Sequence, residues 1–326
     1  MLLDGQVAAD VERAAALLAD GELVAFPTET VYGLGARADD DRAVSKIFSA
    51  KGRPANHPLI VHVAEPADAA RFASNMPPVA QRLIDAFWPG PLTVIVPRAE
   101  GIAAAAAGGQ NSIGLRCPAH PVAQALLLAA RERGVAGVAG PSANRFGRVS
   151  PTQAAHVLAE FDDSIAVLDG GACSVGIESS IVDCSRDRAV LLRPGVLTRA
   201  RIEAAAGEPL LEPDAEAPRA PGTLAAHYAP TAKLRLMSTP MLATALQMLA
   251  QESLSLAVYS RSLALNVAPH VRHRRMPAQP EQAAHELFTV LREFDAEGVQ
   301  LLWVEMPPPG PEWDGVRDRL QRAAAA

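Results

Sequence analysis

The chain has 326 residues, of which 49% are hydrophobic and 20% charged, a composition typical of globular proteins. Its length exceeds the roughly 250–300 residues at which a single hydrophobic core usually stops growing, so we expect two domains. The 36 acidic residues outnumber the 30 basic ones and give a net charge of −6, which argues against a protein that grips nucleic acid through bulk positive charge.

The sequence also argues against a membrane protein. No apolar run approaches the ~20 residues of a membrane-spanning helix, and the first residues, MLLDGQVAADVER, lack the basic and apolar regions of a signal peptide. We therefore expect a cytoplasmic protein without a membrane partner. The three cysteines form no C-x-x-C pair, so we expect buried apolar thiols rather than disulfides or zinc ligands.

Residues 1–206 contain predicted strands and helices in mixed order. The segment 27–41, with its prolines and glycines, is expected to be a loop, and the Ala- and Gly-rich segment 101–110 a loop or a weak helix. Predicted helices cover 7–19, 42–50, 67–73, 78–87, 121–133 and 152–160, and predicted strands 22–26, 58–63, 92–96, 112–117, 135–139, 165–168, 180–184 and 189–192. This order predicts one α/β domain with a mixed, twisted sheet flanked by helices.

Residues 207–230 carry five prolines and few apolar residues, which is typical of an extended linker. The apolar and aromatic residues of LAAHY, 224–228, indicate that this linker docks on something. In residues 231–326, strands alternate with helices, so we expect a small Rossmann-like domain with a parallel sheet. Its predicted strands are 233–237, 255–259, 270–276 (a basic strand or loop) and 299–304, and its predicted helices 241–251, 281–294 and 313–325.

Polar residues gather where the predicted strands end, which is where open α/β sheets bind ligands, although motifs such as G-x-x-x-x-G-K-[ST] and G-x-S-x-G do not occur. The first cluster is KGRPANHP, 51–58. Lys51 offers a point charge and Arg53 a bidentate clamp for a polyphosphate, and Lys51 is one of only three lysines in the chain. The alternative is an ordinary basic helix C-terminus.

The second cluster is GPSANRFG, 140–147, just after a predicted strand. The side chains of Ser142 and Asn144 and the N–H groups of the turn can hold a phosphate or a metal-bound water. Ser and Asn are also ordinary turn formers, so a purely structural role stays open.

A third group lies near other strand ends. Thr28, Thr30 and Tyr32 in the turn PTETVYGLG, with His62, suit a small polar ligand such as an amino acid; the alternative is a satisfied core histidine and ordinary turn threonines. Arg116 and Arg193 each end an apolar strand and need a partner, either a ligand carboxylate or phosphate or an acidic residue of the chain.

Taken together, seven segments in order resemble the L-threonylcarbamoyladenylate synthase family, whose catalytic part is the YrdC-like domain. They are FPTETVYGLGA (26–36), KGRPANHPLIVHV (51–63), WPGPLT (88–93), GLRCPAHP (114–121), GPSANRFGRVSPT (140–152), GIESSIVD (176–183) and LLRPG (191–195). PGTLAAHYAP (221–230) and the trailing α/β domain are similar to the longer, two-domain form of the family.

The resemblance implies a nucleotidyltransferase that joins L-threonine, bicarbonate and ATP into threonylcarbamoyl-AMP and pyrophosphate, for modification of the adenosine beside the anticodon of certain tRNAs. It implies Mg²⁺ with the ATP, downstream tRNA-modifying transferase proteins as partners and no tight direct tRNA binding. The implied catalytic residues are Lys51 and Arg53, and no protein side chain is identified as a metal ligand. The implied ATP contacts are Lys51, Arg53, His57, Ser112, Ser142, Asn144, Arg193 and Tyr228, and the implied threonine contacts are Thr30, His62, Arg116 and Ser180.

The chemistry matches these residue types, because a threonine carbamate must attack the anionic α-phosphate while pyrophosphate leaves. We expect Lys51, Arg53 and Mg²⁺ to face the phosphates and Arg116 to hold the threonine carboxylate. The sequence identifies no general base. Many relatives have Asn where this chain has His57, so its contact is an open point. We expect the linker residues His227 and Tyr228 to fold over the nucleotide as a lid.

Two alternatives remain. An RNA-binding module of the same fold would use a groove lined by Lys and Arg. The net charge of −6 and the 4% aromatic content argue against this alternative. The one dense basic patch in the sequence, RHRR at 272–275, lies away from the motifs, and we expect it to be a solvated edge. A related carbamoyl-adenylate maturation enzyme is the second alternative.

Overall fold

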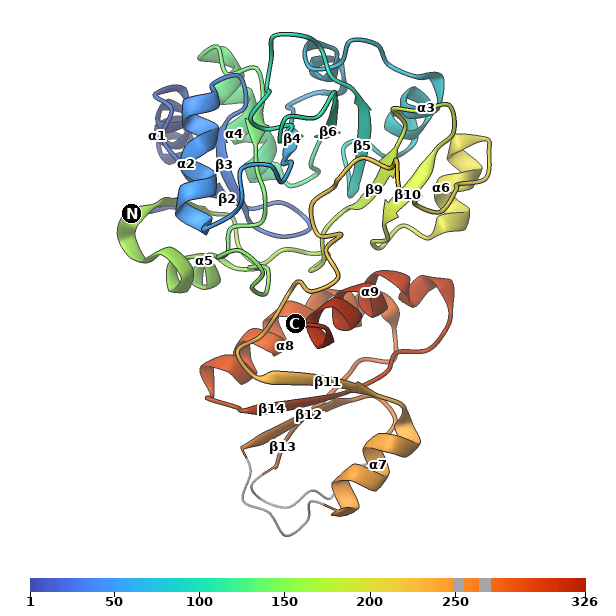
Figure 1. Ribbon diagram of the computed structural model, residues 1–326. Coiled ribbons are helices and arrows are strands. Elements are labelled where there is room, and N and C mark those ends of the chain that lie inside the picture. The colour runs from blue at the N-terminus through green and yellow to red at the C-terminus, as the bar shows by residue number, and fades with distance from the viewer. Residues whose placement is uncertain (249–254, 264–270) are drawn as a thin grey trace. The chain divides into compact units, whose positions relative to one another are not determined.

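The computed structural model describes residues 1–248, 255–263 and 271–326, which fall into two compact units (Figure 1). The first unit comprises Met1–Phe146 and Ser150–Thr223, and the second comprises Gly147–Val149 and Leu224–Ala326. The predicted linker, 207–230, is therefore divided, because its last residues, including His227, belong to the second unit.

A ten-stranded sheet forms the centre of the first unit. Its order is β1-β8-β2-β3-β7-β4-β6-β5-β9-β10, with parallel and antiparallel neighbours, so the predicted mixed sheet is confirmed. The strands are β1 (Leu2–Asp4), β2 (Val24–Phe26), β3 (Gly33–Arg37), β4 (Ile60–His62), β5 (Leu92–Pro97), β6 (Ser112–Arg116), β7 (Val138–Ala139), β8 (Ala166–Asp169), β9 (Ser180–Asp183) and β10 (Val190–Arg193).

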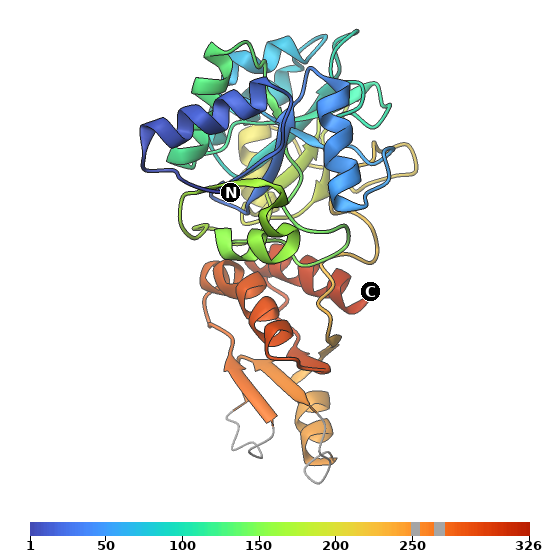
Figure 2. The ribbon, with the colours of Figure 1, turned by 90° about the vertical axis from the view of Figure 1, so that its left-hand side faces the viewer.

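Helices cover this sheet, and two hydrophobic clusters lie between them and the strands. Val24 and Phe26 belong to the cluster beneath α1 and α4, whereas Ala25 belongs to the cluster beneath α2 and α3, so the clusters lie on opposite faces of β2. Figure 2 shows α1 and α4 side by side. The helices are α1 (Ala8–Ala19), α2 (Asp41–Lys51), η1 (Pro66–Arg71), α3 (Pro78–Phe87), α4 (Pro121–Glu132), α5 (Ala154–Phe161), η2 (Asp162–Ser164) and α6 (Arg199–Ala206).

Four described elements, β1, β3, α6 and the short helix η2, were not expected from the sequence. The prediction assigns Gly33 and Gly35 of β3 to a loop, but glycine is what lets this strand approach its neighbours. A Cβ atom on Gly35 would lie 2.8 Å from Cγ1 of Val138 and 3.0 Å from Cε1 of Phe26. The segment 101–110, expected as a loop or a weak helix, forms consecutive turns.

Two parallel strands in the sheet end together. β4 ends at His62 and β6 ends at Arg116, and these two residues are partners in the β4–β6 register. Paired residues on neighbouring strands point to the same face of a sheet. The imidazole and the guanidinium group therefore leave the sheet side by side.

The second unit contains a four-stranded parallel sheet of order β11-β14-β12-β13, which confirms the predicted parallel α/β domain. Its elements are β11 (Lys233–Met237), α7 (Thr239–Met248), β12 (Leu256–Ser260), β13 (Val271–Arg275), α8 (Pro280–Ala296), β14 (Leu301–Glu305), η3 (Pro311–Trp313) and α9 (Asp314–Ala324). The end of the predicted helix 241–251 and the first residue of the predicted segment 270–276 lie outside the described residues.

The basic patch predicted at residues 272–275 is the exposed edge strand β13. Arg272 pairs with Glu297 at 2.9 Å and Arg274 with Glu293 at 3.7 Å. Carboxylates of this unit thus neutralise part of the patch. Separately, no described helix combines the length and the apolar character that crossing a membrane requires.

Candidate active site

Lys51, the last residue of α2, is 3% exposed. Gly52 follows in the left-handed conformation, with φ 62°, and ends the helix. The Lys51 ammonium group donates hydrogen bonds to the carbonyl oxygens of Ser142, at 2.6 Å, and of Asn144. The structure thus brings the predicted Lys-x-Arg and Ser-x-Asn pairs together, and Lys51 contacts the backbone of the second pair.

The surroundings of Lys51 disfavour its positive charge. Burial, and then the charge of Arg53, lower the pKa of Lys51 well below its usual range, while Glu160 and Glu178 act in the opposite direction. A phosphate placed beside the ammonium group would raise this pKa again, because an opposite charge favours the charged form. An anion beside Lys51 would therefore favour the charged form of its ammonium group.

The side chains of Arg53 and His57 both pack against the ring of Phe146. The Arg53 guanidinium carbon lies 5.6 Å from the centroid of the Phe146 ring, and Nη2 donates to the carbonyl oxygen of Pro58 at 2.9 Å. The His57 ring packs edge-on against Phe146, with 5.4 Å between centroids. Burial, then the charges of Arg53 and Arg219, lower the pKa of His57. At neutral pH His57 therefore offers a neutral polar edge rather than a third positive charge.

A small hollow lies beside Arg53, and one of its lining residues is Pro58, whose carbonyl oxygen accepts the Arg53 hydrogen bond. Ile60 and Ile181 are among its apolar lining residues, and Thr93 and Ser112 are among its polar ones. Predominantly apolar walls with a few polar groups are typical of small-molecule sites. The predicted residue Ser112 therefore lies in a hollow next to the Lys51–Arg53 cluster.

Residues 217–221, which we call the strap, pass beside this hollow, and Arg219 and Pro221 line it. The Gln110 side-chain amide donates to the Arg219 carbonyl oxygen at 3.1 Å and accepts from the Arg219 N–H group at 2.8 Å. Nη2 of Arg219 donates to the carbonyl oxygen of Gly108 at 3.2 Å. The first part of the predicted linker is thus fastened to the first unit.

Arg193, at the end of β10, connects the strap with β9. It donates from Nη1 to the carbonyl oxygen of Pro221 at 2.9 Å and from Nε and Nη2 to that of Ser179 at 3.1 and 2.9 Å. The Ser179 hydroxyl lies 2.8 Å from the hydroxyl of Thr93, a lining residue of the hollow. Arg193 thus contacts Pro221, another lining residue, and its partners include two backbone carbonyl oxygens.

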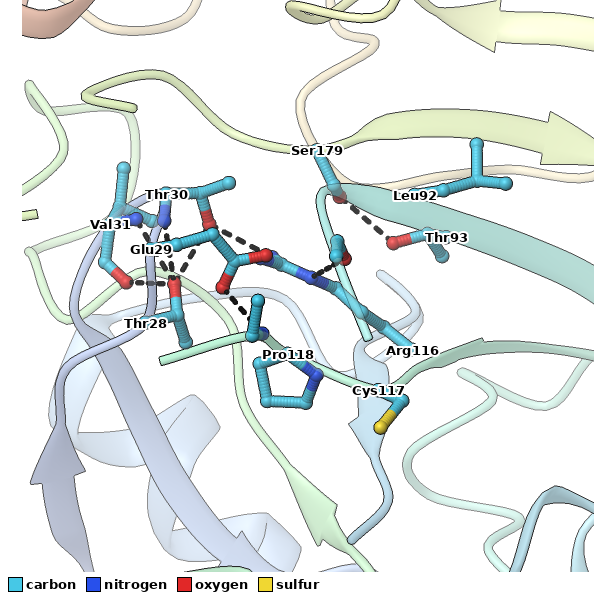
Figure 3. Close-up of polar contacts among 12 residues, drawn as sticks. Thr28, Glu29, Thr30, Val31, Leu92, Thr93, Arg116, Cys117, Pro118 and Ser179 are labelled. Carbon is cyan, nitrogen blue, oxygen red and sulfur yellow. Dashed lines mark hydrogen bonds and ion pairs between the residues drawn. The ribbon is translucent and has the colours of Figure 1, made fainter. Parts of the chain in front are cut away.

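Arg116 forms an ion pair with Glu29, in which Nη2 and Oε1 are 2.6 Å apart and the side chains are 4% and 9% exposed (Figure 3). Nη1 of Arg116 donates to the Thr30 hydroxyl at 2.8 Å, and Nε donates to the Gly90 carbonyl oxygen at 3.2 Å. The sequence left two kinds of partner open for Arg116, a ligand anion or an acidic residue of the chain, and the structure shows the acidic residue, Glu29. It also shows that Thr30 lies next to Arg116.

A hydrogen-bonded turn holds Glu29 and Thr30 in place. The Thr28 hydroxyl oxygen accepts from the N–H groups of Thr30 and Val31, both at 3.2 Å. Oε2 of Glu29 accepts from the N–H group of Ala119 at 3.1 Å. Figure 3 shows this turn facing the Arg116 guanidinium group.

His62 Nδ1 and Ser180 Oγ are buried and have no hydrogen-bond partner within the described part of the chain. Burial, and then the charge of Arg116, lower the pKa of His62 to about 3, so its imidazole is neutral at physiological pH. Buried polar atoms without partners are uncommon in folded proteins. These two atoms are therefore candidates for ligand contact, as the sequence predicts.

Tyr228 belongs to the second unit, where it is 1% exposed. Its ring stacks on Phe288, with 5.4 Å between centroids, and the Arg319 guanidinium carbon lies 5.3 Å from it. The nucleotide contact of Tyr228, and the lid that includes His227, stay predictions.

Sequence reasoning missed three polar residues of this region: Glu29, Thr93 and Ser179. Glu29 stands in the same PTETVYGLG turn as Thr30, and a search for the acidic partner of Arg116 would have found it. Ser179 and Ser180 are adjacent in GIESSIVD, and the motif alone does not say which hydroxyl faces which neighbour. In the structure the Ser179 hydroxyl forms hydrogen bonds with the Thr93 hydroxyl and the Arg193 guanidinium group.

No group of three or more His, Cys, Asp or Glu side chains in the described ranges is placed to hold a metal ion.

Two family models match the chain. The model described as Telomere recombination matches residues 16–195, and the model described as Threonylcarbamoyl-AMP synthase, C-terminal domain, matches residues 197–325. The threonylcarbamoyl-AMP synthase of Bacillus subtilis is 39% identical over 324 residues, covering 96% of this chain and 92% of its own length. This chain belongs to the threonylcarbamoyl-AMP synthase family.

Relatives from Pyrococcus abyssi agree with this membership. Its threonylcarbamoyl-AMP synthase is 42% identical over 233 residues, which cover 70% of this chain and 67% of that protein. A structure of P. abyssi Sua5 complexed with L-threonine is similar to this one with a TM-score of 0.89 and 34% identity, covering 99% of this chain and 97% of its own. The predicted family fold, a YrdC-like domain followed by a smaller α/β domain, is thereby confirmed.

Proposed function

We propose that this protein is an L-threonylcarbamoyladenylate synthase, which joins L-threonine, bicarbonate and ATP into threonylcarbamoyl-AMP and pyrophosphate. The observation that carries the proposal is the hydrogen bonding of Lys51 to the carbonyl oxygens of Ser142 and Asn144, near a hollow, in a chain of this family. The product would serve downstream tRNA-modifying transferases in the cytoplasm, which place the threonylcarbamoyl group on the adenosine next to the tRNA anticodon.

The reaction combines two anionic partners. The threonine amine and bicarbonate form a carbamate with loss of water, and a carbamate oxygen then attacks the α-phosphorus of ATP while the bond to the β-phosphate oxygen breaks. Lys51 and Arg53 are the catalytic residues of this proposal, because fixed cations beside the phosphates stabilise the charge that moves to the leaving pyrophosphate. Their preformed contacts keep the cost of reorganisation low.

ATP would bring Mg²⁺ as its usual counterion. The ion prefers oxygen ligands and keeps several waters, so the phosphate oxygens can be its main ligands. In this proposal Ser142 and Asn144, whose carbonyl oxygens accept from Lys51, contact a phosphate oxygen or a metal-bound water through their side chains. The metal would neutralise charge on the phosphates.

In this proposal the adenosine part of ATP binds beside the hollow that Ser112 lines. His57, which precedes the lining residue Pro58, and Arg193, which donates to the carbonyl oxygen of the lining residue Pro221, are its neighbours there. Threonine fits the neighbouring sheet edge. There Arg116 and the Thr30 hydroxyl are available for its carboxylate, and the unpartnered atoms of His62 and Ser180 are available for its polar groups.

The decisive experiment measures pyrophosphate release from ATP with each other substrate left out in turn. A synthase requires both L-threonine and bicarbonate. Release that is independent of threonine, or RNA binding without any release, contradicts the proposal and favours the RNA-binding alternative. Turnover with carbamoyl phosphate in place of threonine and bicarbonate would instead identify a carbamoyl-adenylate maturation enzyme.

A further inference from the structure

The ion pair of Glu29 and Arg116 has no evident structural purpose. Both side chains are more than nine-tenths buried, with charged atoms 2.6 Å apart. Removing two charges from water has a large free-energy cost, and a pair of well-packed apolar residues usually serves stability equally well. A role in ligand recognition accounts for the pair better than stability does, and the surroundings of the pair support this role.

Each partner keeps unused hydrogen-bonding capacity. A guanidinium group has five N–H groups, and the described hydrogen bonds of Arg116, to Thr30 and Gly90, use two of them. Its Nη2 lies 2.6 Å from Oε1 of Glu29, but among the described residues neither of these two atoms has a hydrogen-bond partner. A carboxylate accepts about four hydrogen bonds, and the described contacts of Glu29 are those to Arg116 and to the N–H group of Ala119. A second carboxylate can thus join Arg116 while a second cation joins Glu29.

The nearby polar atoms add no net charge. His62, the register partner of Arg116, is neutral because burial and Arg116 depress its pKa, and its Nδ1 has no partner in the described part of the chain. The region therefore presents one positive and one negative group in contact, beside an unpartnered neutral one. A ligand head with one negative and one positive group in contact is complementary to it, and a free α-amino acid has such a head.

We propose that Glu29 is a specificity-determining residue that binds the α-ammonium group of the threonine whose carboxylate Arg116 binds. The inference rests on the proposed function and extends it, because it explains how the site would prefer an amino acid over a hydroxy acid of the same shape. Glu29 keeps its contact with Arg116 in the complex, so that four charges alternate in sign and none is buried alone.

The test compares two ligands on the full-length protein by titration calorimetry: L-threonine and 3-hydroxybutyrate, which lacks only the ammonium group. The wild type should bind threonine at least about tenfold more tightly, the size of one charge-assisted hydrogen bond. Glu29→Gln should lose most of this preference by weakening threonine binding alone. Glu29→Asp, which keeps the charge, should restore part of it.

The matched control is Glu22→Gln, which removes a carboxylate from the exposed pair with Lys46 and should leave both affinities unchanged. Equal losses for both ligands in Glu29→Gln would mean a merely structural role and overturn the inference. So would a wild type that binds 3-hydroxybutyrate as tightly as threonine, a result that requires no variant to fold. Absence of any threonine binding by the wild type would overturn the proposed function as well.

Discussion

The ammonium nitrogen of Lys51 lies 2.6 Å from the carbonyl oxygen of Ser142, so the two loops that carry the phosphate-binding candidates are joined before a ligand arrives. One loop follows α2 and the other follows β7, more than eighty positions apart in the chain. A site held in this way needs little rearrangement when charge develops on a bound phosphate.

Replacing Lys51 by Met tests this arrangement, because Met keeps most of the aliphatic chain and removes the charge. We expect pyrophosphate release to fall by about 10²-fold or more, as is typical when a preorganised electrostatic group is lost. Lys46→Met is the control, since Lys46 makes a surface pair with Glu22. Steady-state kinetics measure both variants, and activity of Lys51→Met within about twofold of wild type would contradict the assigned role.

The buried pair of Glu29 and Arg116 predicts strong thermodynamic coupling. Arg116→Met alone and Glu29→Leu alone each leave the charge of the other residue buried without an opposite charge, and each should lower the free energy of unfolding by about 3–5 kcal/mol. The double variant should be more stable than either single one, which urea denaturation would show. The surface pair of Arg131 and Glu65 provides the comparison, with coupling of at most about 1 kcal/mol. Additive losses at Glu29 and Arg116 would be inconsistent with the ion pair.

The depressed pKa of His62 predicts a specific pH dependence of stability. Its pKa is about 3 in the folded protein and about 6.5 when unfolded, so between these values the unfolded chain binds more protons. Stability should therefore be complete above pH 6.5 and fall as the pH drops toward 3, by up to about 1.4 kcal/mol per pH unit.

Other histidines with lowered pKa values, His57, His120 and His273, contribute to the same slope. The relevant measurement is therefore the difference between the wild type and His62→Gln, by urea denaturation from pH 7.5 to 5. The variant should show a shallower decline. Identical slopes for the two proteins would contradict the buried, neutral state of His62.

The two hydrogen bonds between Gln110 and Arg219 predict that Gln110→Ala loosens the strap. Loss of both bonds weakens the attachment by about 1–2 kcal/mol, so amide exchange in residues 217–221 should accelerate roughly 5- to 30-fold. Hydrogen–deuterium exchange followed by mass spectrometry reads this directly. Gln81→Ala, which removes an exposed helix contact with Asp85, should leave the strap unaffected. An unchanged exchange rate in Gln110→Ala would show that other contacts hold the strap.

Local patterns predicted the regular elements well. The helix predicted at 78–87 is α3, which starts with a proline at a position where no helical N–H bond is lost. β3 was missed because Gly33 and Gly35 are loop residues by propensity, and only the close approach of Phe26 and Val138 explains them. Such a tertiary constraint leaves no local signal.

For the candidate site, the sequence predicted several of the residues but not the contacts they make. The motifs identified Lys51 and Arg116 as candidates. They did not predict that Lys51 would donate hydrogen bonds to carbonyl oxygens or that Arg116 would form an ion pair with Glu29. These partners come from distant strands and turns, and the sheet order that joins them was not deducible from periodicity. Propensity also gave no sign that Tyr228 would pack within the second unit.

The register of β4 and β6 links folding accuracy to the chemistry of the site. Side chains alternate between the faces of a strand, so a slip of one residue would turn Arg116 to the opposite face and bring Leu115 to its place beside His62. Such a chain would lose its ion pair and the proposed threonine site together. Quality control that removes unstable chains would therefore also remove the inactive ones, without any separate test of activity.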